Sequence, residues 1–362
     1  MNTPSRTLLI MAGGTGGHVM PALAVAERMR ADGWRVVWLG TRAGMEARLA
    51  VEKGFDMAWV KVAGVRGKGL LAKLILPLNL LVSFWQAARA IFRERPDVAL
   101  GLGGYVAFPG GMMASLLAKP LVIHEQNAVA GLTNKVLSHL ADRVLLGMPL
   151  AGGDAALGRT TEWVGNPVRP EIAALPAPSA RMAGHEGPLH LLVIGGSLGA
   201  SALNERVPQA LALVPEGQRP LVRHQSGHKH LDILKGHYAE AGVEAECLDF
   251  IGDMAAAFEW ADVVICRAGA LTVAEIAASG SAALFVPFPY AVDDHQTANA
   301  RFLADASAAW LKQQDELTPE GLAEWLLGLD RDEILARAEK ARGLARPDAT
   351  ARVAEVVKEL AK

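Results

Sequence analysis

The sequence has only two cysteines, Cys247 and Cys266, among its 362 residues. Two cysteines cannot build a disulfide framework, and they form no Cys-x-x-Cys pair or Cys/His spacing of a zinc site. The long apolar stretch of a signal peptide is missing as well, because the start through Arg6 runs directly into strand-like residues 7–12. These absences predict a protein that stays in a reducing compartment, the cytoplasm.

The chain also lacks a strong net charge, which is -2, and with 51% hydrophobic and 20% charged residues it lacks the composition of a disordered protein. Its length predicts two α/β domains. The charge is unevenly spread, since Met1–Gly165 holds 18 Lys and Arg against 11 Asp and Glu, and the remainder holds 18 against 27. A basic first half favours an anionic partner, with chance variation between domains as the alternative; no nucleic-acid partner is expected.

Short apolar runs alternate with longer helical patterns in both halves, which is typical of doubly wound parallel sheets. The strands predicted for the first half are 7–12, 35–40, 58–62, 98–101, 121–124 and 143–146, and those for the second are 189–194, 221–224, 246–250, 262–266 and 282–286. A Gly/Pro-rich segment over 164–170 separates the two sets. We predict an N-terminal domain over 1–165, a C-terminal domain over 166–342, and a helix over 343–362 that packs back on the N-terminal domain.

Glycine-rich turns follow several of these strands. They are Gly13–His18, Gly101–Tyr105 and Gly195–Ala200, and a related turn around Gly269 opens a helix that carries Thr272 and Glu275. Glycine lets backbone N–H groups converge, and a helix N-terminus favours an anion. Ligands of doubly wound folds bind at the carboxyl ends of strands, so the turns predict one anion-binding cleft. Tight turns with purely structural glycines are the alternative for any one of them.

A nicotinamide cofactor is not expected, although the first turn resembles a dinucleotide-binding motif. That motif needs an acidic residue at the end of the second strand to hold the ribose, and this strand ends in Trp38-Leu39-Gly40-Thr41. One further segment, Leu70–Trp85, is unusually apolar and has basic residues on both sides, yet it is too short and too interrupted to span a bilayer. It is either a buried core helix or an interfacial helix on an anionic lipid surface, and the basic first half favours the second.

In combination these motifs resemble the MurG family of N-acetylglucosaminyltransferases of peptidoglycan synthesis. The resemblance rests on Gly13–His18, Gly103–Gly111, His124–Asn127, Gly165–Arg169, Gly195–Ala200 and Arg267–Glu275, in order along the chain. It implies the glycosyltransferase-B architecture, in which two Rossmann-like doubly wound domains face a cleft. It also implies that the donor is UDP-N-acetylglucosamine, the acceptor is undecaprenyl-linked lipid I, and the product is lipid II. Attachment would be peripheral, at the cytoplasmic face of the bacterial inner membrane, with cell-wall synthesis proteins as further candidate partners.

Site residues follow from the resemblance position by position. The donor site is expected at Thr15, Gly16, Gly17, Asn127, Arg169, Ser197, Ile251, Ala270, Leu271, Thr272, Val273, Ala274, Glu275 and Gln296. Ile251 suits the uracil, Arg169 and Ser197 the diphosphate, and Glu275 the ribose, unless Glu275 is only a capping-box residue. The acceptor diphosphate is expected at Gly14, His18, Gly103, Gly104 and Tyr105, and the membrane contact at Leu74, Ile75, Leu78, Leu80, Trp85 and Lys73.

The implied β-1,4 product from an α-linked donor requires inversion, most simply a single displacement by the acceptor hydroxyl. His18 is the candidate base, because its unperturbed pKa of about 6.5 suits proton transfer near neutral pH. Glu125 is the rival base or a loop-organising carboxylate, and His124 is expected to support its strand end. The helix after Gly269, with Arg267 and Ser197 nearby, is expected to stabilise the departing diphosphate.

No cofactor and no metal ligand are assigned. The Asp-x-Asp motif of many metal-dependent glycosyltransferases matches only Asp330-Arg331-Asp332, which we interpret as a helix cap. Two other functions remain open at this point: a UDP-N-acetylglucosamine 2-epimerase, which would need no apolar segment, and a non-catalytic UDP-sugar-binding scaffold at the membrane.

Overall fold

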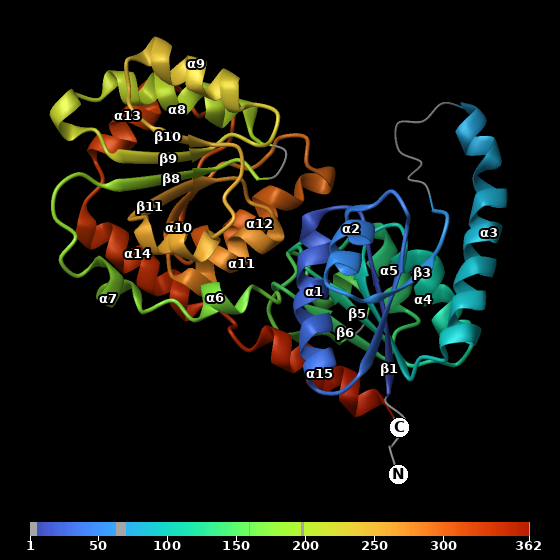
Figure 1. Ribbon diagram of the computed structural model, residues 1–362. Coiled ribbons are helices and arrows are strands. Elements are labelled where there is room, and N and C mark those ends of the chain that lie inside the picture. The colour runs from blue at the N-terminus through green and yellow to red at the C-terminus, as the bar shows by residue number, and fades with distance from the viewer. Residues whose placement is uncertain (1–5, 63–69, 159, 197–198, 362) are drawn as a thin grey trace. The chain divides into compact units, whose positions relative to one another are not determined.

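The structure is a computed structural model that describes residues 6–62, 70–158, 160–196 and 199–361, with the backbone alone at 70–76. The chain divides into two compact units (Figure 1). Unit 1 comprises Met1–Val168 and Arg346–Lys362, and unit 2 comprises Arg169–Ala345. The division therefore falls after residues 168 and 345, where the sequence predicted 165 and 342.

Unit 1 contains a seven-stranded parallel sheet in the order β3-β2-β1-β4-β5-β6-β7. Its strands are β1 (Thr7–Ala12), β2 (Arg35–Gly40), β3 (Asp56–Trp59), β4 (Val98–Gly103), β5 (Leu121–Glu125), β6 (Arg143–Leu146) and β7 (Glu162–Trp163). Its helices are α1 (Gly16–Ala31), α2 (Met45–Glu52), α3 (Leu70–Glu94), α4 (Ala107–Leu116), α5 (Leu132–Ser138) and α15 (Ala349–Leu360), with a 3-10 turn η1 at Asp154–Ala156.

Successive residues of β1 face opposite sides of this sheet, as in any strand, and the two sides carry separate cores. Leu8 and Ile10 pack with α1 and α15, whereas Leu9 and Met11 pack with α3, α4 and α5. The C-terminal helix α15 belongs to the first core through Val353, Ala354, Val356 and Val357. It is further held by Arg352, whose guanidinium pairs with Glu162 on β7 at 2.7 Å.

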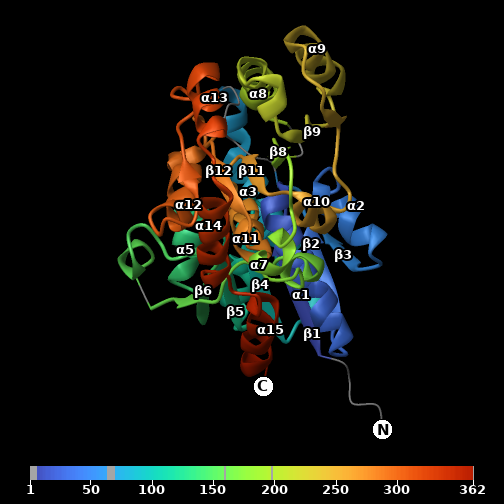
Figure 2. The same cartoon turned by 90° about the vertical axis from the view of Figure 1, so that its left-hand side faces the viewer.

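Unit 2 contains a six-stranded parallel sheet in the order β10-β9-β8-β11-β12-β13. Its strands are β8 (His190–Ile194), β9 (Leu221–Gln225), β10 (Glu246–Leu248), β11 (Val263–Cys266), β12 (Ala282–Phe285) and β13 (Trp310–Leu311). Its helices are α6 (Pro170–Ala173), α7 (Pro178–Met182), α8 (Ser201–Leu213), α9 (Leu231–Ala241), α10 (Met254–Trp260), α11 (Ala270–Ser279), α12 (His295–Ala304), α13 (Pro319–Leu327) and α14 (Arg331–Gly343), with 3-10 turns η2 (Glu216–Gln218) and η3 (Val292–Asp294). Figures 1 and 2 show α8, α9 and α13 on one face of the sheet and α10, α11, α12 and α14 on the other.

These two sheets confirm the predicted fold class of two Rossmann-like doubly wound domains. The strands predicted at 7–12, 35–40 and 143–146 have the observed bounds, and the other predicted strands differ by a few residues at their ends. The two-residue strands β7 and β13 were not predicted. Such short edge strands leave no periodic pattern to detect.

Strand order reverses once in each sheet, and this reversal positions the site. In unit 1 the chain crosses from β3 back to the far side of β1, so β1 and β4 are neighbours; in unit 2 the same happens at β8 and β11. Ligands of open α/β sheets bind beyond the carboxyl ends of the strands at such a switch point. The predicted glycine turns follow these four strands.

Helix α3 departs from the pattern of an ordinary surface helix. Its large apolar side chains Leu78, Leu81, Trp85 and Phe92 are between 62% and 66% exposed. The side that faces unit 1 carries smaller residues, Ser83, Ala87 and Ala90, together with Ile91. Among the described residues, no helix combines the length and the hydropathy that crossing a membrane requires.

Candidate functional site

The two glycine turns of unit 1 lie in direct contact at the switch point between β1 and β4. A side chain on Gly104 would place its Cβ 2.1 Å from the carbonyl oxygen of Gly13, so only glycine allows the two backbones to meet. Gly104 also has a φ of +81°, which other residues rarely adopt. The two predicted turns therefore form one structure.

His18 lies in this structure, in the first turn of α1. A Cβ on Gly103 would come within 2.8 Å of its imidazole Cδ2, so the ring packs directly on the second turn. Thr15 is the N-cap residue of α1, yet its hydroxyl makes no capping hydrogen bond and is exposed. Tyr105, 56% exposed, begins the segment that leads into α4. The amide donors of a helix N-terminus, an imidazole and a phenol thus come from neighbouring strand ends, a set of groups that suits an oxyanion or phosphate ligand.

One residue of this site was missed from the sequence. Glu46 on α2 is only 1% exposed, and its carboxylate accepts the Gly14 amide at 3.2 Å and the Thr41 amide at 2.9 Å. The Gly14 amide is therefore already bonded, which corrects its assignment as a donor to the acceptor diphosphate. Its signal in the sequence is weak, because an acidic residue in the first turn of a helix is common on the protein surface.

The loop after β5 is organised by Glu125, which is 2% exposed. One carboxylate oxygen accepts the backbone and side-chain N–H groups of Asn127, and the other accepts Gly131 N–H and the Asn134 amide at 2.8 Å. Because both carboxylate oxygens are occupied by N–H donors of its own loop, this arrangement favours the loop-organising interpretation of Glu125 over that of the rival base.

His124 supports the end of the same strand. Its Nε2 donates to the Gly165 carbonyl at 2.9 Å, and its Nδ1 accepts from the Gln126 side-chain amide at 3.2 Å. Complete burial lowers the pKa of His124, while the bond to Gly165 opposes that shift. His124 is thus a neutral residue that ties β5 to the segment where unit 1 ends.

In unit 2 the third glycine turn follows β8. A Cβ on Gly199 would lie 2.1 Å from the Ser226 carbonyl oxygen, so this turn also requires glycine for a close backbone approach. The Gln225 side chain donates to Gly196 O at 2.9 Å and to Asp249 O at 3.2 Å, which ties the turn to the loop before Ile251. Ile251 is buried. The donor-site assignment of Ser197, and its neighbour Leu198, lie outside the described residues.

The fourth turn begins α11, with Gly269 as its N-cap. The predicted residues Ala270, Leu271, Thr272, Val273 and Ala274 form its first turns, so several amide donors point out of the helix start. Glu275 follows one turn later and is not a capping-box residue, because that position in this helix belongs to Thr272.

Glu275 forms an ion pair with Arg169. The Arg169 Nε and Nη2 atoms donate to the same oxygen, Glu275 Oε1, at 3.0 and 2.8 Å. Burial raises the pKa of the Glu275 carboxyl, and the Arg169 charge offsets part of that shift. Because both bonds end on Oε1, Oε2 can accept hydrogen bonds from a ligand's hydroxyl groups.

Two further side chains hold the loops around α11. Gln296 in the first turn of α12 accepts the Ala268 and Phe288 amides with its Oε1 atom, so only its NH₂ group remains to act as a donor. Arg267 donates to the Val286 and Pro287 carbonyl oxygens and to Gln314. Burial lowers the pKa of Arg267 to about 10. These bonds correct the expectation that Arg267 stabilises a departing diphosphate, because its guanidinium anchors the loop after β12 instead.

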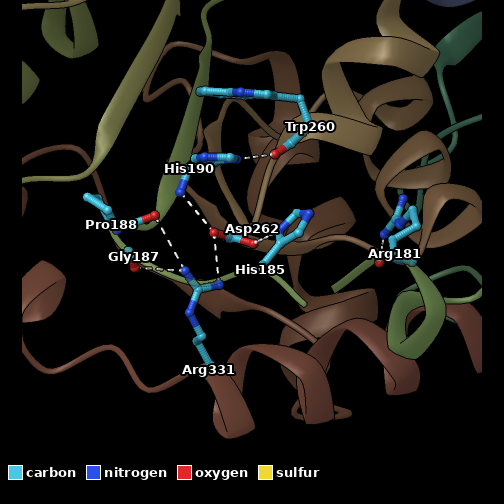
Figure 3. Close-up of polar contacts among 9 residues, drawn as sticks. Arg181, His185, Gly187, Pro188, His190, Trp260, Asp262 and Arg331 are labelled. Atoms are coloured by element: carbon cyan, nitrogen blue, oxygen red, sulfur yellow. Dashed lines mark hydrogen bonds and ion pairs between the residues drawn. The ribbon is translucent and has the colours of Figure 1, made fainter. Parts of the chain in front are cut away.

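A cluster of His185, His190 and Asp262 lies at the opposite, amino-terminal edge of the sheet of unit 2 (Figure 3). Its ligand-type atoms lie within 4.8 Å of one another, but both Asp262 oxygens are already engaged. One is bonded to His185 Nδ1 at 2.7 Å; the other accepts the His190 amide at 2.9 Å and pairs with Arg331 at 3.1 Å. The positive charge of Arg331 would repel a cation here, so we interpret the cluster as a structural network of hydrogen bonds and ion pairs and not as a metal site. Asp330 caps α14 beside it, as expected for that acidic motif.

Comparison with known proteins finds two family domains in this chain. Residues 8–146 match the glycosyltransferase family 28 N-terminal domain, and residues 190–360 match the glycosyltransferase family 28 C-terminal domain. Proteins named UDP-N-acetylglucosamine--N-acetylmuramyl-(pentapeptide) pyrophosphoryl-undecaprenol N-acetylglucosamine transferase are similar over the whole chain. That of Cupriavidus metallidurans is 60% identical over 99% of each chain, and that of Thiobacillus denitrificans is 60% identical over 100% of each chain.

Among solved structures, the crystal structure of Acinetobacter baumannii MurG is similar, with a TM-score of 0.85 and 42% identity over 98% of this chain and 99% of that one.

The contact between the two turns of unit 1 yields a stability prediction. Gly104→Ala should lower the free energy of unfolding of unit 1 by several kcal/mol, because a left-handed φ costs about 1–2 kcal/mol and the clash with Gly13 adds to it. Gly54→Ala is the matched control: its φ is +72°, but a Cβ there meets nothing within 4 Å. Urea unfolding of both variants measures the difference. Equal losses of unfolding free energy would show that the contact between the turns does not contribute to stability.

Proposed function

The chain belongs to glycosyltransferase family 28, and within it to the MurG family, and from that membership we propose the reaction and the roles of its residues. The protein transfers N-acetylglucosamine from UDP-N-acetylglucosamine to the muramyl sugar of the undecaprenyl-diphosphate-linked pentapeptide, which converts lipid I to lipid II. The observation that carries the assignment of roles is the start of α11, where helix amides and the Arg169–Glu275 pair stand together at a switch point.

Unit 2 is proposed to bind the nucleotide donor. The N-terminus of α11 offers unpaired amides and a positive dipole end to the diphosphate, and Arg169 adds a full charge nearby. Glu275 Oε2 accepts the ribose hydroxyls, while Ile251 lies beside the base and the Gln296 NH₂ group contacts the sugar. During transfer, negative charge grows on the departing diphosphate, and these donors stabilise it without moving.

Unit 1 is proposed to bind the acceptor. Gly103, Gly104 and Tyr105 contact the lipid-linked diphosphate beside the start of α1, and the packing of His18 on Gly103 fixes the direction of its imidazole. Inversion by a single displacement needs a base that takes the proton of the attacking 4-hydroxyl as the new bond forms. His18 is the proposed base, since the Glu125 carboxylate is occupied by four N–H donors.

The transfer reaction is tested by incubating the protein with labelled UDP-N-acetylglucosamine and a lipid I analogue. We expect a lipid-linked disaccharide, and folded protein that makes none above a no-enzyme control would disprove the function.

In the same assay His18→Ala should lower kcat by about a hundredfold, the usual contribution of a general base, while the KM for the donor stays nearly constant. His139→Ala, on an exposed part of unit 1, is the control; near-normal turnover of His18→Ala would remove His18 as the base.

The role of Glu275 predicts a loss of nucleotide affinity. Glu275→Ala should weaken UDP binding by at least about tenfold, the contribution of one hydrogen bond to a charged group. Isothermal calorimetry with UDP measures the change, and parallel titrations with deoxy-UDP separate the ribose contacts from the effect on Arg169. Glu240→Ala on the exposed face of α9 is the control. Equal affinity of Glu275→Ala and the wild type would show that Glu275 does not bind the ribose.

Helix α3 is proposed to rest on an anionic membrane surface. Leu78, Leu81, Val82, Trp85 and Phe92 form an exposed apolar stripe, and Arg89 and Arg93 flank it. Trp85, Arg89, Phe92 and Arg93 also line an open hollow of about 460 Å³. Apolar burial in the interface and about 1 kcal/mol per cationic side chain near anionic lipid favour binding.

The structure refines the membrane residues. Of the residues expected there, Leu78 and Trp85 are exposed, Leu80 is half-buried beside the more exposed Leu81, and the side chains of Lys73, Leu74 and Ile75 lie outside the description. Peripheral attachment at the cytoplasmic face of the bacterial inner membrane is the proposed location.

Replacing Leu81 and Trp85 with Ser should reduce binding to vesicles that contain phosphatidylglycerol at least tenfold in a sedimentation assay. Because both side chains are exposed, the melting temperature should change little. Leu213 and Leu221, exposed to 53% and 52% in unit 2, provide the matched double replacement by Ser, which should bind like the wild type. If the wild type and both double variants bind vesicles equally well, α3 does not contact the membrane.

A further inference from the structure

The structure places the Glu46 carboxylate at the end of β2, where the sequence predicted no acidic residue. The end of β2 carries no acidic residue in sequence, but α2 brings the Glu46 carboxylate back to that strand end. There it accepts the Thr41 amide at 2.9 Å and the Thr41 hydroxyl at 2.8 Å with Oε1, and the Gly14 amide at 3.2 Å with Oε2. Where a dinucleotide-binding fold uses its acidic residue to hold a ribose, this carboxylate turns inward to the glycine turn.

Three glycines make the space that this carboxylate fills. A Cβ on Gly44 would lie 2.0 Å from Glu46 Oε2, one on Gly40 would lie 2.8 Å from Cγ, and one on Gly13 would lie 3.0 Å from Oε1. Gly40 ends β2, Gly13 follows β1, and Gly44 is the N-cap of α2. The three backbones therefore surround one side chain. A methyl group on Gly40 or Gly44 would collide with it, and one on Gly13 would press closely against it.

Burying an ionised carboxylate is costly unless its oxygens are satisfied. Here three donors and the positive end of α2 meet that requirement, since Glu46 lies in the first turn of that helix. The result is a fixed link between the ends of β1 and β2. Gly14 immediately precedes Thr15, the N-cap of α1, so the link fixes the peptide from which the first turn of α1 and His18 continue.

We propose that Glu46 is a positioning residue of the transfer reaction. It contacts no substrate; it holds the Gly13–Gly14 peptide so that the α1 amides and the His18 imidazole keep one orientation against Gly103. The inference rests on the proposed function, because it assigns Glu46 to the acceptor and base side of that reaction. A shift of about 1 Å in such groups can cost a hundredfold in rate.

The first test is Glu46→Gln, which keeps the size of the side chain but turns an NH₂ group toward a donor. With wild-type protein active, kcat should fall between about ten- and a hundredfold while the KM for UDP-N-acetylglucosamine stays within about twofold, because the donor residues of unit 2 are untouched. Amide hydrogen exchange in residues 13–18 should accelerate. Glu52→Gln, the same change at an exposed position of the same helix, should match the wild type in every measurement.

A second test fills the space around the Glu46 carboxylate and leaves Glu46 itself unchanged. Gly44 has a φ of -81°, so alanine fits its backbone, and Gly44→Ala should lower kcat only because the new methyl group displaces the Glu46 carboxylate. Once Glu46→Ala has removed that carboxylate, adding Gly44→Ala should lower kcat no further. Such non-additivity is the signature of two residues acting through one contact.

The outcomes separate the two claims. Inactive wild-type protein would disprove the proposed function, and the exchange measurement would still test Glu46. Any of three results would overturn the positioning role of Glu46. They are unchanged amide hydrogen exchange in residues 13–18, a normal kcat of Glu46→Gln, and additive losses of kcat when the Gly44 and Glu46 replacements are combined. A lower melting temperature with unchanged kcat per UDP-binding site would also overturn it, because it would make Glu46 a stability residue alone.

Discussion

Close backbone approach at the carboxyl ends of parallel strands is the constraint on which the functional site depends. In unit 1 the turns after β1 and β4 touch at Gly13 and Gly104, where a Cβ would come within 2.1 Å of a carbonyl oxygen. In unit 2 the turn after β8 meets Ser226 equally closely at Gly199. These contacts let α1 and α8 begin close to the carboxyl ends of β1 and β8, where the amide donors of a helix N-terminus can face a ligand.

Buried carboxylates hold these glycine-rich loops in place, and their chemical roles differ with their partners. The carboxylate oxygens of Glu46 and Glu125 accept backbone N–H groups, which directs both side chains at the loops around them. Glu275 meets a cation instead, and both bonds from Arg169 end on one oxygen. Burial raises the pKa of Glu275, and the Arg169 charge opposes part of that shift. The same residue type thus organises a loop at one strand end and forms an ion pair at another.

The sequence predicted the parallel sheets and the turns well, because apolar runs followed by glycine depend on local chemistry. It could not predict Glu46, whose role arises when α2 folds back on the end of β2 and three glycines separated along the chain leave room for it. Arg267 shows the opposite error, since a cation beside a glycine turn was expected to face a diphosphate but is held by carbonyl oxygens of the loop after β12. Both cases depend on long-range contacts, which neither periodicity nor motif spacing records.

Helix α3 inverts the pattern that a soluble surface helix follows. Such a helix turns its large apolar residues inward and its polar residues outward. Here Ser83, Ala87 and Ala90 face the sheet of unit 1, while Leu81, Trp85 and Phe92 face outward. Small inward residues let the helix lie close to α4 and the sheet, so the large outward side chains are not needed for the core. Their exposure costs free energy in water, and that cost disappears only where another apolar phase covers them. The proposal of an anionic lipid surface as that phase rests on Arg89 and Arg93 beside the stripe, because a second copy of the same basic face would repel them.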